Sequence, residues 1–179
     1  MKKFLGVLFA VILLFGLSAC SLFGGKNEEN GGNNSNGGNS IFNSTKTLTC
    51  TKTEVDDDGD KTDATLTVTY KNDIIKKIVS TELTSLDAEY IEFAISFGKA
   101  AAEEFNKVNG LNISYTADGA DKLKIETVID YDSLDLDALA SIVDDLAEEG
   151  ELENSFYKSK ELKIEDIQKE MIEDGYTCK

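Results

Sequence analysis

The fold is decided by residues 45–70, which read TKTLTCTKTEVDDDGDKTDATLTVTY. In residues 45–55, Leu48 and Cys50 point to one side of an extended chain, while threonines occupy the other side. Residues 64–70 repeat this alternation. Threonine favours the extended backbone, and the acidic, glycine-containing run between the two parts is typical of a turn. The stretch therefore predicts two strands joined as a hairpin, each with one apolar and one polar face.

Further along the chain, the same alternation predicts three more strands, at residues 74–79, 111–116 and 123–131. The first of them is less regular because Lys76-Lys77 interrupts the pattern, which predicts a bulge or a place at the edge of the sheet. Asp118-Gly119 lies between the other two and predicts a second hairpin.

Apolar residues spaced three and four apart predict three helices, ending at Gly110, Gly150 and Gly175. The first begins after a Thr84-Ser85 N-cap and has a wide apolar side flanked by aromatic residues. An aromatic stripe at this spacing is more often part of a core than of a ligand-binding surface, so we expect it to be buried. The stripe consists of Tyr90, Phe93 and Phe97.

The order of elements is strand, strand, strand, helix, strand, strand, helix, helix. Short turns between successive strands predict an antiparallel sheet, and one apolar face per strand predicts two layers. We therefore expect a single α+β domain at residues 45–179, with an antiparallel sheet of about five strands and helices packed on one face.

Residues 1–19 have the layout of a lipoprotein signal peptide. Two lysines precede an uncharged run, residues 4–16, which is too short to be a membrane-spanning helix. The run leads into Leu17-Ser18-Ala19-Cys20, the lipobox pattern, in which Cys20 is lipidated and becomes the first residue of the mature chain. This predicts a lipid anchor in the cell membrane and an extracytoplasmic domain. The alternatives are an ordinary secretory peptide cut before Cys20 and an uncleaved anchor helix.

The anchor and the domain are joined by residues 20–44, which begin with Cys20 and are rich in glycine, asparagine and serine. Such a segment cannot bury enough apolar surface to offset the entropy of ordering it. It predicts a flexible tether with a root-mean-square span of about 25–30 Å.

The composition restricts the classes of function. All 18 basic residues are lysines, against 34 aspartates and glutamates, and the net charge is −16. This acidity repels nucleic acid, so we expect no nucleic-acid partner. It would attract metal cations or basic peptides. The alternative is that the acidic surface only keeps the protein soluble. The absence of histidine removes the usual general base, and the absence of arginine removes bidentate anion clamps. We expect no cofactor.

With Cys20 lipidated, Cys50 and Cys178 are the two remaining thiols of an exported domain. Disulfides form in such compartments, so we expect these cysteines to be bonded, with the end of the chain clamped onto the first strand. The alternative is two free thiols in an organism that does not oxidise its exported proteins.

Two acidic regions of the sequence contain the carboxylates that a metal site would need. The run from Glu54 to Gly59 begins like a calcium loop, but Thr65 stands where a bidentate glutamate belongs, so we interpret it as the hairpin loop. The carboxylates between Asp130 and Asp145 suit the start of a helix, where they satisfy unpaired amides. We therefore assign no metal ligand, and a weak divalent-ion site in the second region is the alternative. No catalytic residue is predicted, because no pair of carboxylates is placed across a cleft by the sequence.

Several short segments resemble the YehR-like family of small bacterial lipoproteins, whose function is unknown. They are Thr49-Cys50-Thr51, Tyr70-Lys71-Asn72-Asp73, Glu89-Tyr90, Asn109-Gly110-Leu111, Ile129-Asp130-Tyr131 and Gly175-Tyr176-Thr177-Cys178-Lys179. The resemblance covers residues 45–179 and implies an α+β domain on a lipid anchor. It implies no catalytic residue.

Three functions are compatible with these features. The first is a lipid-anchored, non-enzymatic binding or interaction module whose partner the sequence does not identify. The second is an acidic domain that captures cationic peptides, proteins or divalent metal ions. The third is an extracytoplasmic enzyme that uses carboxylates.

Overall fold

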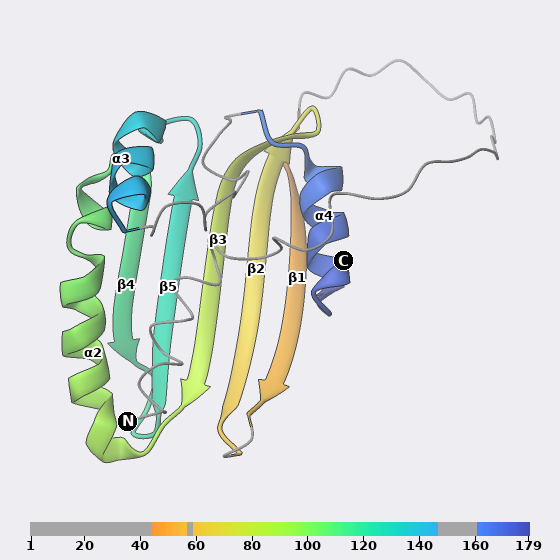
Figure 1. The fold of residues 1–179 in the computed structure, drawn as a ribbon. Helices are drawn as coiled ribbons and strands as arrows, with labels where there is room; N and C mark the ends of the chain where they lie inside the picture. Colours follow the sequence, from red (N-terminus) through yellow and green to blue (C-terminus); the bar gives the residue numbers. More distant parts are fainter. Residues whose placement is uncertain (1–43, 57–58, 147–160) are drawn as a thin grey trace.

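The structure is a computed structural model that describes residues 44–56, 59–146 and 161–179. These residues form a six-stranded antiparallel sheet in the order β4-β5-β3-β2-β1-β6, which confirms the α+β prediction with one strand more than expected. Figure 1 shows β4, β5, β3, β2 and β1 side by side in this order. The strands are β1 (Lys46–Val55), β2 (Lys61–Lys71), β3 (Ile74–Ser85), β4 (Leu111–Ala117), β5 (Lys122–Asp130) and β6 (Thr177–Cys178). The helices are α2 (Ala88–Ala102), α3 (Leu136–Leu146) and α4 (Ile164–Glu173), with a 3₁₀ turn η1 (Phe105–Lys107).

The register places the apolar residues of the strands on one face of the sheet, called here the inner face. One row of directly opposed residues crosses five strands. It consists of Leu48, Val68, Ile78, Ile129 and Leu111. This row belongs to a single core with the buried sides of the helices, and the outer face of β1 and β2 carries mostly threonine. The alternation in the sequence therefore decides which face the helices cover.

The turn between β2 and β3 consists of Asn72 and Asp73, both with positive φ (51° and 63°), as a tight two-residue hairpin requires. Close to it, the register shifts from Thr69 opposite Lys77 to Tyr70 opposite Ile75, which is a β-bulge. The predicted bulge is confirmed. The alternative, an edge position, is wrong, because β3 lies between β5 and β2.

The first predicted helix begins later and ends earlier than expected. Thr84-Ser85 belongs to β3, and Asp87 is the N-cap residue of α2. After Ala102 the chain tightens into η1, where the Asn106 side chain donates to the carbonyl of Ile113 (2.9 Å) and accepts from its amide (2.6 Å). Asn106 thus pairs with the free edge of β4 as a neighbouring strand would. Because this contact fixes the position of η1, the chain leaves the α-helix after Ala102.

The last helix, α4, ends as predicted at a glycine with positive φ, Gly175 (+87°). The chain then forms β6, which pairs with the edge of β1. This strand was not predicted, because two residues are too few to show an alternating pattern. Three other expectations concern residues outside those described: the signal peptide at 1–19, the tether up to residue 43, and the helix end at Gly150.

Among the described residues, every helix is too short or too polar to cross a lipid bilayer.

Gly98→Ala is expected to destabilise the domain by about 1–3 kcal/mol. An added Cβ would lie 2.3–2.6 Å from the ring of Tyr115, which is only 1% exposed and has little room to move. Helix propensity alone predicts the opposite sign, a gain of about 1 kcal/mol for glycine to alanine. Urea unfolding measures the difference, and Ser96→Ala at an exposed position of α2 is the control. A stabilised Gly98→Ala variant would contradict the close packing.

Candidate binding surface

Three aromatic side chains of α2, Tyr90, Phe93 and Phe97, are exposed, and they are called here the aromatic row. Their exposed fractions are 40%, 54% and 46%, so the prediction that they belong to the core is wrong. The buried side of α2 consists of Ile91, Ala94, Gly98 and Ala102 instead. Because three of these four residues are small, the helix lies too close to the sheet for large rings to fit beneath it. Figure 1 shows α2 beside β4 at one side of the sheet.

The aromatic row has a defined geometry. Phe93 and Phe97 are one helical turn apart, and their rings stack with centroids 6.2 Å apart and planes inclined by 13°. Tyr90 lies one turn before Phe93. The exposed carboxylate of Glu89 lies one turn before Phe93 on the same side of α2. The row therefore combines fixed apolar area with negative charge.

A second feature is a carboxyl group on the inner face, Glu82 of β3. It lies opposite Ala64 on one side and Ile125 on the other, and Ile125 lies opposite Tyr115 of β4. Burial raises the pKa of Glu82 to about 7, and the nearby charge of Glu54 adds to this rise.

The charge of Glu82 affects the pKa values of two nearby tyrosines. Burial raises the pKa of Tyr115 and that of Tyr176 to about 12, and the charge of Glu82 contributes to both shifts. Glu82 therefore lies between Tyr115, under α2, and Tyr176, which follows α4.

Sequence reasoning missed Glu82. The signal was present, because Glu82 is in phase with the buried Ile78 and would be placed on the inner face by simple alternation.

The acidic hairpin between β1 and β2 borders a shallow pocket of about 360 Å³. Its lining consists of Glu54, Val55, Asp56, Asp60 and Thr62. The Asp56 carboxylate accepts a hydrogen bond from the amide of Asp60 (2.8 Å), which is the role of a turn residue. This agrees with the interpretation as a hairpin loop, although residues 57–58 lie outside those described.

The second acidic region caps a helix as expected. The Asp135 carboxylate accepts from the amide of Ala138 (3.0 Å) at the start of α3, and the Asp130 carboxylate accepts from the amide of Asp132 (3.1 Å). Within the described parts of the chain, no three cysteine or acidic side chains gather closely enough to hold a metal ion.

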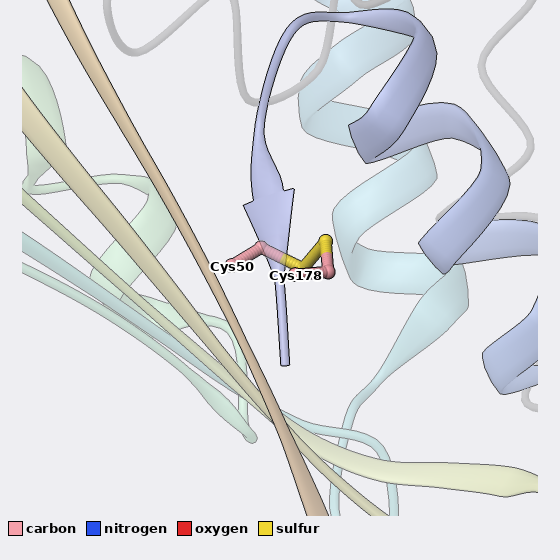
Figure 2. The surroundings of a disulfide bond; sticks show 2 residues. All are labelled: Cys50 and Cys178. Atoms are coloured by element: carbon pink, nitrogen blue, oxygen red, sulfur yellow. A yellow bond between two sulfur atoms is a disulfide. The ribbon is translucent and has the colours of Figure 1, made fainter.

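Of the three cysteines, the structure brings two together. Cys50 of β1 and Cys178 of β6 form a disulfide with an S–S distance of 2.02 Å and a Cα–Cα distance of 4.0 Å (Figure 2). The two residues are directly opposed in the β1–β6 pair, and Cys50 is fully buried. The predicted pairing is confirmed. Cys20 lies outside the described residues.

The fold is similar to that of a solved structure. The NMR structure of the Escherichia coli YehR protein matches with a TM-score of 0.52 and 16% sequence identity, over 77% of this chain and 93% of that chain. This chain has the YehR fold. The resemblance seen in the sequence is thereby supported at the level of the fold, and the likeness to YehR assigns no function.

An NMR structure of a protein from Streptococcus pneumoniae TIGR4 has a TM-score of 0.49 and 16% identity, over 89% of this chain and 100% of that chain. No protein-family model matches the sequence, and no curated protein matches it.

Proposed function

We propose that the protein is a lipid-anchored, extracytoplasmic binding module without catalytic activity. The observation that carries the binding role is the aromatic row of α2, in which Phe93 is 54% exposed and stacked on Phe97. Exposed aromatic side chains that lie together on a soluble domain mark interaction sites, because removing them from water on binding is strongly favourable.

The location is supported by the cysteines. The Cys50–Cys178 disulfide is typical of a domain exposed to an oxidising compartment, and residues 1–20 provide the export signal and the lipidated residue. A protein held by two or three acyl chains on Cys20 stays on the bilayer durably, since each buried methylene contributes about 0.8 kcal/mol.

A more specific form of this function is the capture of cationic peptides or proteins. It is favoured by a net charge of −16 and by the exposed carboxylate of Glu89, which lies one helical turn before Phe93 on the same side of α2. Binding through such a field weakens steeply with ionic strength, whereas binding through apolar contacts alone does not.

The anchor is tested by the intact mass of protein extracted from membranes. The wild type is expected to start at Cys20 and to carry the added mass of the lipid, and Cys20→Ser is expected to remain an unprocessed precursor of full length. Ser18→Ala serves as the control, because it changes the leader without removing the thiol. A wild-type mass that corresponds to an unmodified Cys20 would refute the lipid anchor.

A further inference from the structure

We propose that the aromatic row of α2 is the docking surface for a cationic amphipathic peptide segment. This proposal rests on the binding function proposed above and specifies its site and the chemistry of its partner. The row offers three rings on adjacent turns of one helix, with exposed fractions between 40% and 54%. An apolar side chain of the partner would contact the stacked pair of Phe93 and Phe97, which is already ordered and loses little freedom on binding.

The charges around the row select a cationic partner. Glu89 precedes Phe93 by one helical turn and therefore lies on the same side of α2, whereas Glu92 lies about 100° around the axis from Phe93. The lysine of this helix, Lys99, follows Phe97 by two residues and therefore lies about 200° around the axis from it. Lysine or arginine side chains of a partner would meet both the ring faces and the carboxylate of Glu89.

The same charges disfavour two other occupants. A second copy of the chain would bring together two domains with a net charge of −16 each, and Glu89 of one copy would approach Glu89 of the other. An anionic membrane surface would be repelled by Glu89 and by the negative net charge of the domain. A cationic segment with an apolar side is therefore the partner that fits both the rings and the charge.

The test uses the full chain in phosphatidylcholine nanodiscs and a synthetic peptide of about 14 residues, roughly four helical turns, made of lysine and leucine with one tryptophan. Because the protein contains no tryptophan, the emission of the peptide reports binding without background from the protein. Empty nanodiscs correct for binding of the peptide to lipid. A peptide with glutamate in place of lysine keeps the apolar pattern and reverses the charge.

The double variant Phe93→Ser/Phe97→Ser is expected to lower the affinity for the lysine peptide by about tenfold or more. The matched control is Val55→Ser/Ile172→Ser, which removes two apolar side chains that are 64% and 54% exposed elsewhere on the domain, and it is expected to leave the affinity unchanged within about twofold. Circular dichroism checks that all variants remain folded.

The charge is tested separately with Glu89→Gln, which is expected to weaken binding and to reduce its dependence on salt between about 0.05 and 0.5 M. Glu165→Gln, at an exposed position of α4, is the matched control.

Equal affinity of Phe93→Ser/Phe97→Ser and the wild type for the lysine peptide would overturn the proposal. Equal binding of the glutamate peptide, or no binding of the lysine peptide to a protein whose Cys20 carries lipid, would overturn it while leaving the anchor in place.

A third outcome concerns the disfavoured occupants. If the wild type dimerises, or binds vesicles of anionic lipid, and Phe93→Ser/Phe97→Ser abolishes that association, the row belongs to that partner and the peptide proposal is wrong. Sedimentation of the protein in nanodiscs and with added vesicles measures both.

Discussion

Cys178→Ser is expected to lower the free energy of unfolding by about 2–5 kcal/mol. The Cys50–Cys178 bond spans 128 residues of sequence and joins the first strand of the domain to the end of the chain. In the chain-entropy model a loop of this length constrains the unfolded chain by about 4–5 kcal/mol. The effect is large because nearly the whole domain lies between the two cysteines.

The folded state also changes in this variant. β6 is held to β1 by the disulfide and by two backbone hydrogen bonds between Thr49 and Lys179, of 3.0 and 2.9 Å. A two-residue strand without the covalent bond is held weakly, so the edge of β1 becomes open to pairing with other chains. We therefore expect the variant to self-associate more readily than the wild type.

Urea unfolding followed by circular dichroism measures the stability. Cys50→Ser/Cys178→Ser and the reduced wild type are the controls, and both are expected to be destabilised to a similar extent. Titration of thiols in the denatured, lipidated wild type tests the premise. Two reactive thiols before any reductant is added would show that the bond is absent.

Glu82→Gln is expected to stabilise the domain at pH values above about 7, by up to about 3 kcal/mol. In the unfolded chain the pKa of a glutamate is close to its model value of 4.5, whereas burial raises the pKa of Glu82 to about 7 in the folded domain. The folded state therefore binds the proton more tightly. The stability that this group contributes is fully present below about pH 4.5 and is lost as the pH rises through about 7.

Glutamine has nearly the shape of a protonated glutamic acid and does not ionise, so Glu82→Gln removes this pH dependence. Near pH 4.5 the variant and the wild type are expected to have similar stability, and the difference grows up to about pH 8. Glu126→Gln is the matched control, because Glu126 lies on the neighbouring strand β5, faces solvent beside Lys124 (3.0 Å) and is expected to change stability by less than about 0.5 kcal/mol. Parallel stability curves for Glu82→Gln and the wild type would show that Glu82 is not buried as described.

Much of the fold was predictable because the patterns that specify it are local. Alternation in β1, β2, β4 and β5 identified those strands and their faces, and Asp118-Gly119 identified a hairpin whose glycine has φ of +83°. The end of α4 was predictable from Gly175 for the same reason. The end of α2 was not, because it depends on the contact of Asn106 with Ile113, two residues that lie on different elements.

The candidate surface was predictable only in part. Helical spacing correctly placed Tyr90, Phe93 and Phe97 along one side of α2, but it assigned that side to the core. Whether a ring at the border of the apolar side is buried depends on how the helix is rotated against the sheet. Gly98 decides this rotation by admitting the ring of Tyr115, a residue of another strand.

The sequence by itself determined the strand pattern, the inner and outer faces of the sheet and the acidic charge, because each depends on residues close together in the chain. It also determined that Cys50 and Cys178 were available to pair. Only the tertiary structure decided that β6 pairs with β1 at these cysteines, that Glu82 is partly buried near Glu54, and that the aromatic row is exposed. Burial and pKa depend on neighbours that are distant in sequence, and only the packed fold brings those neighbours together.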